Sequence, residues 1–315
     1  MVELLERDLL FVTGKGGVGK TTIAAALALL AANQGKRTLL CDTDARGDLA
    51  GSFEGGEVGF APRQLQPNLW AMAMDTEASL REYLRLFLRL PAIARLGPLA
   101  RTFDFVATAA PGVREILVVG KVCYEVRERH WDLVVVDAPA SGQVASQLAA
   151  PEAINELVKV GLVRQQTGWM MDILSDPARA GVVAVSTPEE MPVNETIELV
   201  ARLASETRVD LAAVVVNRVL PELFGRAEEE AFEALCRPGP VRAMSDALGG
   251  DVAPVMEAAR LAVRLRRGRA EHLARLRAAV TGEVPLLYLP YLFARGSGLR
   301  ATRRLSAALA AELGW

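Results

Sequence analysis

The stretch GKGGVGKTT at residues 14–22 decides the fold, because it fits the pattern GxxxxGK[ST]. The apolar run Leu9–Val12 precedes it and a helical pattern begins at Thr21, so it lies between a predicted strand and a predicted helix. In that context a glycine-rich loop turns successive backbone N–H groups onto phosphates, and the helix N-terminus adds a favourable dipole. The sequence therefore predicts a loop that cradles the phosphates of a nucleoside triphosphate.

The last two residues of the pattern separate a triphosphate site from a dinucleotide site. The glycines also fit the dinucleotide fingerprint GxGxxG, and Asp42 lies near the distance expected for an acid that binds ribose. A dinucleotide turn has no need of Lys20 and Thr21, whereas a triphosphate loop uses the lysine on the β- and γ-phosphates and the threonine hydroxyl on Mg²⁺. We therefore predict ATP or ADP with Mg²⁺ as the ligands.

The rest of the chain alternates short apolar runs with helical patterns. Several runs are continuously apolar, as expected of strands covered on both faces, and the alternation implies a doubly wound, mostly parallel sheet. We predict a single α/β domain of the P-loop NTPase class over residues 1–315. The predicted strands are Leu9–Val12, Thr38–Cys41, Leu69–Met74, Leu133–Val136, Val182–Val185, Leu211–Val216 and Val284–Leu289. The predicted helices are Thr21–Gln34, Ser79–Leu90, Ala149–Val163, Val193–Ser205, Glu228–Leu235, Ala253–Val280 and Leu299–Leu313.

The connection between the third and fourth predicted strands is long. It has apolar helical patterns of its own, interrupted by several prolines. We predict that it forms an inserted helical subdomain beside the sheet, over approximately residues 76–130 together with residues 150–178.

The composition is that of an ordinary globular protein, with 51% hydrophobic residues and a net charge of −2. No run of lysine or arginine marks a nucleic-acid surface, so we expect no nucleic acid partner. The three cysteines form no CxxC pair, and no apolar stretch approaches the ~20 residues that span a bilayer. The N-terminal residues lack the pattern of a signal peptide. We expect a cytoplasmic protein, with peripheral attachment to a membrane left open.

Lys15 is the unusual residue of the loop. From the second position it cannot easily join Lys20 on the phosphates of its own chain, and it is better placed to reach across a dimer, as an arginine finger does. A KGGVGK loop with this extra lysine resembles the deviant P-loop ATPases, which include the arsenite-pump, tail-anchored-protein targeting, chromosome-partitioning and division-site ATPases. The resemblance implies an ATP-hydrolysing homodimer, or a heterodimer with a related ATPase chain.

Two stretches that follow predicted strands resemble the switches of the arsenite-pump and targeting group. Residues 42–53 read DTDARGDLAGSF, similar to the first switch DPAxNLSxxF, and the match puts Asp44 on the residue that positions or activates the attacking water. Three departures in this stretch lean towards the partitioning ATPases. Residues 137–143 read DAPASGQ, similar to the second switch DTAPTGH, although Gln143 stands where the family has histidine. The resemblance thus makes Lys15, Lys20 and Asp44 the predicted catalytic residues.

Acids at strand ends supply the predicted metal site. An apolar strand that ends in Asp beside a phosphate loop usually holds Mg²⁺ through water, which is the role predicted for Asp137. Asp42 and Asp44 are two residues apart, so both could face the phosphates if the strand persists. A turn-capping role for these two acids is the alternative. The predicted metal residues are Thr21, Asp137 and Asp42.

Two further positions match the nucleotide contacts of the family. Asn217 follows a predicted strand and matches an asparagine that contacts adenine, a base edge that suits an amide's donor and acceptor. Pro290 begins the loop that covers the base in the family. A plain turn role is the alternative for each. The predicted nucleotide-binding residues are Gly14, Lys15, Gly16, Gly17, Val18, Gly19, Lys20, Thr21, Thr22, Asn217 and Pro290.

The resemblance runs from about Leu9 to Leu313. The second switch, PGVRE at residues 111–115 and PE at residues 188–189 favour the arsenite-pump and targeting group over the partitioning ATPases. The zinc-binding CxxC of eukaryotic targeting ATPases is absent, which points to a bacterial branch with a single ATPase unit.

The sequence leaves open which process the hydrolysis of ATP drives. The apolar patterns at Ser79–Leu90 and Val160–Leu174 could line a groove for a hydrophobic or membrane-protein client, or they could lie in the core. An ATPase subunit that energises a membrane anion transporter, a partitioning-type switch and a non-hydrolysing regulatory subunit are the alternatives.

Overall fold

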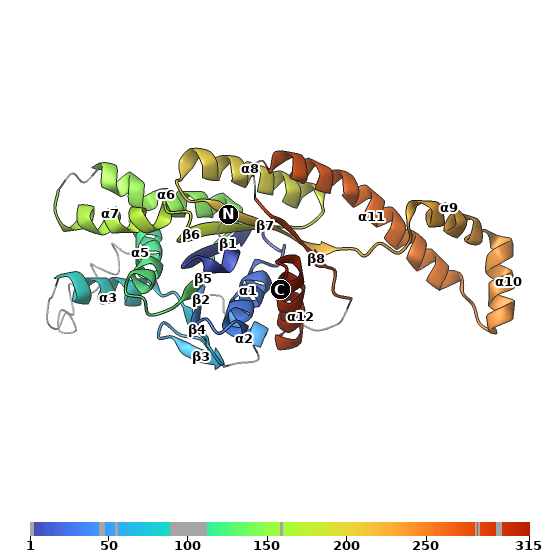
Figure 1. Ribbon diagram of the computed structural model, residues 1–315, viewed down its shortest axis with the longest axis horizontal. Helices are drawn as coiled ribbons and strands as arrows, with labels where there is room; N and C mark the ends of the chain where they lie inside the picture. Colours follow the sequence, from blue (N-terminus) through green and yellow to red (C-terminus); the bar gives the residue numbers. More distant parts are fainter. Residues whose placement is uncertain are drawn as a thin grey trace.

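The computed structural model describes residues 3–43, 48–53, 56–88, 112–157, 160–280, 282, 284–293 and 298–315, so Asp44 and Pro111 lie outside it. An eight-stranded sheet forms the centre, with helices on both faces (Figure 1). Only β3 and β4 pair antiparallel among the described strands, which confirms the predicted doubly wound, mostly parallel α/β fold. In chain order the strands are β1 (Leu9–Gly14), β2 (Thr38–Asp42), β3 (Arg63–Gln66), β4 (Leu69–Ala73), β5 (Leu133–Asp137), β6 (Ala180–Ser186), β7 (Leu211–Val219) and β8 (Leu286–Pro290).

The strand order is β3-β4-β2-β5-β1-β6-β7-β8, which puts β1 near the middle of the sheet. Every residue of β1, β2, β5 and β6 is buried, because helices cover both faces, and this explains their continuous apolar sequences. The sequence missed β3. Its residues read RQLQ and lie at the edge of the sheet, where one face meets solvent and no apolar pattern is needed.

The helices form two layers. The first holds α1 (Lys20–Asn33), α2 (Asp48–Phe53) and α12 (Leu299–Glu312), and the sheet and α12 bury α1 on all sides. The second layer covers the opposite face, and its members are α5 (Val113–Arg127), α6 (Ser141–Leu157), α7 (Leu162–Leu174), α8 (Glu190–Glu206) and the C-terminal end of α11 (Ala253–Ala279). A short 3₁₀ helix, η1 (Leu4–Glu6), precedes β1.

The helices at one end of the sheet pack on one another. α3 (Thr76–Leu88) contacts α5, and α5 contacts α6 and α7 (Figure 1). The predicted helix Ala149–Val163 is wrong in its bounds, because the chain forms α6 up to Leu157 and starts α7 at Leu162. That these helices form a separate subdomain stays a prediction.

A helical arm projects from the opposite end of the molecule (Figure 1). It consists of α9 (Arg226–Leu235), α10 (Pro238–Leu248) and the N-terminal part of α11. The sequence missed α10, whose Pro-Gly-Pro start reads as a turn, although proline is well tolerated in the first turn of a helix. The root of the arm lies on α8, where Arg269 pairs with Glu189 and Arg275 donates to Asn194 Oδ1 at 2.6 Å.

None of the helices in the described ranges combines the length and apolarity that a bilayer crossing requires.

Candidate functional site

The loop between β1 and α1 requires glycine at two positions. A Cβ on Gly14 would lie 2.1 Å from the carbonyl oxygen of Val185 on the neighbouring strand β6. Gly19 has φ +97°, and a Cβ there would lie 2.6 Å from Nδ2 of Asn217. Within the described ranges, the N–H groups of Gly16, Gly17 and Gly19 donate no hydrogen bond to the protein. The loop therefore offers backbone donors to an anion, as a phosphate cradle must.

Asn217 holds this loop from the end of β7. Its Nδ2 donates to the carbonyl oxygen of Val18 at 2.8 Å, and its Oδ1 accepts from the N–H of Arg218 at 2.9 Å. The side chain is buried, and the bond to Val18 joins segments 199 residues apart. The amide therefore positions the loop, a role that the sequence did not indicate. Contact with adenine through its second N–H stays a prediction.

The three predicted metal residues lie together at the carboxyl edge of the sheet. Thr21 Oγ1 donates to Asp137 Oδ2 at 2.6 Å. Asp137 ends β5 and pairs in register with Asp42, which ends β2, and both acids are buried. Thr43 Oγ1 donates to the carbonyl oxygen of Asp137 at 2.7 Å and fixes this strand end. Two neighbouring buried carboxylates and a hydroxyl form an oxygen-rich site suited to Mg²⁺.

Lys15 has a partner within its own chain. Its Nζ forms an ion pair with Oε1 of Glu195 on α8, and both side chains are partly exposed. Oε2 of the same carboxylate accepts from Ser141 Oγ at 3.1 Å. Ser141 is the first residue of α6 and belongs to the stretch that resembles the second switch. Glu195 therefore joins the phosphate loop to the start of α6.

A second group of predicted residues lines a cavity of about 560 Å³ beside the loop. This volume suits a small-molecule ligand. The end of β7, the end of β8 and the N-terminal turn of α12 form its walls. The predicted nucleotide-binding residues in its lining are Gly19, Thr21, Thr22, Asn217 and Pro290.

The structure thus brings most of the predicted site residues to one edge of the sheet. Lys20 opens α1 and is partly exposed at this edge. Asp44, predicted to position the attacking water, lies outside the described residues. Sequence reasoning missed Glu195, because no local pattern marks a residue that meets the loop from 180 positions away. Arg218 was missed for a similar reason, although it lines the cavity next to Asn217.

Comparison with known proteins identifies the family to which this chain belongs. The family model described as "Anion-transporting ATPase" matches residues 7–171 and 163–234, which is more than half of the chain. The chain belongs to the anion-transporting ATPase family. The expected resemblance to arsenite-pump and targeting ATPases is thereby confirmed, and the chain is an ATPase.

Relatives of this ATPase occur in bacteria, archaea and eukaryotes. ATPase BagA of Mycobacterium tuberculosis is 33% identical over 96% of this chain and 92% of its own length. A protein of Halobacterium salinarum named as an arsenical pump-driving ATPase is 29% identical over 71% of this chain and 37% of its own length. ATPase get3 of Schizosaccharomyces japonicus is 30% identical over 58% of this chain and 54% of its own length.

Proposed function

We propose that the chain is a dimeric ATP-driven switch that handles a hydrophobic or membrane-protein client. The observation that carries the switch is the position of Glu195, which holds both Lys15 of the phosphate loop and Ser141 at the start of α6. A change at the phosphates that moves Lys15 would therefore also alter the carboxylate that Ser141 contacts at the start of α6. This is the kind of coupling that nucleotide switches use.

The proposed chemistry uses the residues at the sheet edge. Lys20 and the loop N–H groups hold the phosphates, and the glycines leave room for them. Thr21 would hold Mg²⁺ directly, with Asp137 and Asp42 acting around it through water. When bound, Mg²⁺ neutralises charge on the transferred phosphoryl group. Asp44 is proposed to orient the water that attacks that group.

Lys15 is proposed to complete the site of a second chain, whether an identical copy or a related ATPase. To do so it must leave Glu195, so an ion pair within one chain is exchanged for a contact across a dimer. The pair is partly exposed, and such pairs contribute only about 0.2–1 kcal/mol. Contacts between Lys15 and a phosphate could offset that cost, so ATP would favour the dimer.

The helices predicted to form a client groove, α3 and α7, bury several apolar side chains in the core, such as Leu84, Met170 and Ile173. Support for a client therefore rests on the targeting ATPases that the chain resembles rather than on an open groove. The relative named as an arsenical pump-driving ATPase supports a second candidate, an ATPase subunit that energises a membrane anion transporter.

One experiment separates these outputs. The full chain is held in its ATP-bound form with a slowly hydrolysed ATP analogue, and bound proteins and oligomeric state are measured by mass spectrometry and light scattering. A dimer that carries proteins with apolar helices supports the client role. Turnover that rises several-fold with arsenite, without such proteins, supports the transporter role. A monomer under saturating nucleotide contradicts the dimeric switch.

A further inference from the structure

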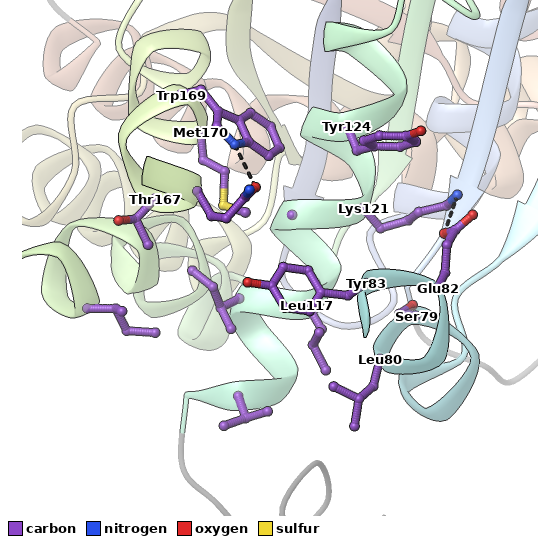
Figure 2. A pocket seen from close by; sticks show the side chains of 15 residues that line it. Ser79, Leu80, Glu82, Tyr83, Leu117, Lys121, Tyr124, Thr167, Trp169 and Met170 are labelled. Atoms are coloured by element: carbon purple, nitrogen blue, oxygen red, sulfur yellow. Dashed lines mark hydrogen bonds and ion pairs between the residues drawn. The ribbon is translucent and has the colours of Figure 1, made fainter. Parts of the chain in front are cut away.

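A partly open apolar cavity lies between α3, α5, α6 and α7, apart from the nucleotide site (Figure 2). Its volume is about 200 Å³, and no residue that lines it belongs to the phosphate loop or the metal site. Its walls are mainly aliphatic and aromatic, and the aliphatic residues include Leu80, Ile116, Leu117 and Ile154. Neither the nucleotide chemistry nor the proposed dimer uses it.

Met170 forms an adaptable part of the wall. A Cβ on Gly120 would lie 2.9 Å from Met170 Cε, so a glycine on α5 lets the methionine side chain of α7 lie directly against that helix. A methionine side chain is flexible and polarisable and adjusts to ligands of irregular shape. The cavity can therefore accept guests of more than one outline.

One polar group in the lining lacks a partner. Ser79 is 4% exposed, and its hydroxyl has no hydrogen-bond partner in the described part of the chain. A buried hydroxyl without a partner is unfavourable, because it has lost its bonds to water without replacement. By contrast, Gln166 Oε1 accepts from Trp169 Nε1 at 2.7 Å. Ser79 therefore offers the cavity a hydrogen bond that no described residue uses.

The charged groups at one end of the cavity select the guest's charge. Lys121 Nζ contacts carboxylate oxygens of Glu82 and Glu125, each at 2.7 Å (Figure 2 shows the contact with Glu82). Burial acts to lower the pKa of Lys121, but its hydrogen bonds to both acids outweigh this and raise the pKa. Among the described residues that line the cavity, Lys121 is the one cation and two acids share it, so that part of the lining offers no free positive charge to a carboxylate ligand. An ionised head would also be costly to bury beside apolar walls.

We propose that this cavity binds a small uncharged amphiphile with one alkyl chain or ring and a hydroxyl or amide head. The apolar part would fill the space between Leu117 and Ile154, and the head would bond to Ser79. A cavity of about 150 Å³ is enough for benzene, so this one admits a slightly larger guest. An α-helix about 10–12 Å wide does not fit, so the ligand is distinct from a membrane-protein client.

The test uses octan-1-ol and octanoate as probes, with binding to the full chain measured by calorimetry. We expect octan-1-ol to bind at least 10-fold more tightly than octanoate. Ile154→Phe fills the cavity and should weaken octan-1-ol binding at least 10-fold. The matched control is Leu157→Phe on the same helix, where the side chain is 83% exposed, and its binding should equal that of the wild type. Leu80→Phe repeats the filling test from α3 in case Ile154→Phe fails to fold.

Ser79→Ala tests the head group. Loss of one hydrogen bond should weaken octan-1-ol binding by about 2- to 10-fold while octanoate binding changes little. The proposal is overturned if octan-1-ol does not bind, if octanoate binds equally well, or if both filling variants, once shown to be folded, bind as the wild type does. ATP turnover is measured in parallel, and because these residues lie outside the nucleotide site, failure of the proposed dimeric switch would leave the binding result intact.

Discussion

Lys15 of the phosphate loop and Glu195 of α8 form an ion pair within one chain, across 180 positions of sequence. The same carboxylate accepts a hydrogen bond from Ser141, the first residue of α6. The lysine that is proposed to act on a second chain is thus paired with an acid of its own chain. That acid also accepts a hydrogen bond from the stretch that resembles the second switch. Four of the predictions below follow from the loop and its partners.

Removing the carboxylate should release the lysine. We expect Glu195→Gln to lower the ATP concentration needed for half-maximal dimer formation by about 1.5- to 5-fold, since a partly exposed pair is worth about 0.2–1 kcal/mol. Sedimentation velocity with increasing ATP measures this shift. Glu198→Gln, an exposed acid one turn further along α8, is the control. An unchanged or raised ATP requirement would mean that Glu195 does not restrain Lys15.

Lys15→Ala should separate binding from hydrolysis. ATP affinity should change less than about 5-fold, because Lys20 and the loop N–H groups remain. Turnover should fall by at least ~100-fold if the lysine acts on a partner's phosphates, since comparable arginine fingers contribute about 10³–10⁵. Phosphate release and nucleotide titration measure the two effects. Full turnover in the variant would refute the proposed role.

Asp137→Asn should affect the Mg²⁺ requirement most. The variant keeps a group that can accept from Thr21 but loses a charge beside Asp42. We expect the Mg²⁺ concentration for half-maximal turnover to rise at least 10-fold, while ADP binding in the presence of a chelator changes little. Titration of turnover against Mg²⁺ checks the first effect and calorimetry the second. Equal loss of ADP binding with and without Mg²⁺ would indicate a structural role instead.

Asn217→Ala should loosen the phosphate loop. It leaves the carbonyl of Val18 without the 2.8 Å hydrogen bond that now holds it. A buried acceptor that loses its partner costs about 1–3 kcal/mol, so we expect a corresponding loss of stability without nucleotide. Urea unfolding measures it, and Asn33→Ala at the exposed last residue of α1 is the comparison. If Asn217→Ala is as stable as the wild type, the amide does not position the loop.

The ion cluster around Lys121 predicts how stability depends on pH. Burial raises the pKa of Glu125, but hydrogen bonds from Lys121, His130 and Trp131 outweigh this and hold the pKa below its ordinary value of 4.5. A lowered pKa stabilises the fold above 4.5, and this contribution is lost as pH falls through the folded-state pKa. Lys121, with its pKa raised above 10.5, stabilises below that value and loses its contribution as pH rises further.

We therefore expect Glu125→Gln to lower the free energy of unfolding by about 3 kcal/mol at neutral pH, near the low end for breaking a buried ion pair because Lys121 keeps Glu82. The difference from wild type should shrink as the pH drops well below 4.5, where the carboxyl of the wild type is protonated. Urea unfolding at several pH values measures it. A difference that stays constant into strong acid would show that charge is not the cause.

Local patterns predicted most of the fold. The apolar runs predicted seven of the strands, and the glycine-rich loop predicted the order strand–loop–helix around residues 14–22. The strand β3 was not predicted, because an edge strand with a polar sequence carries no apolar pattern. The shared position of the predicted metal residues Thr21, Asp42 and Asp137 was predictable because strand ends meet at one edge of a parallel sheet. The contacts of Glu195 with Lys15 and of Asn217 with Val18 were not, because they depend on how distant segments pack.

The length of the helical arm would turn a small tilt at its root into a larger displacement at its far end. Its root, through Arg269 and Arg275, is fastened to α8, the helix that carries Glu195. From Ala253 to Arg269 the arm extends roughly 25 Å at about 1.5 Å per residue, so a tilt of about 10° at the root moves its far end by about 4 Å. Because the arm points away from the sheet (Figure 1), a tilt of α8 would move the far end of the arm by a distance that spin labels at its tip and on the sheet can measure.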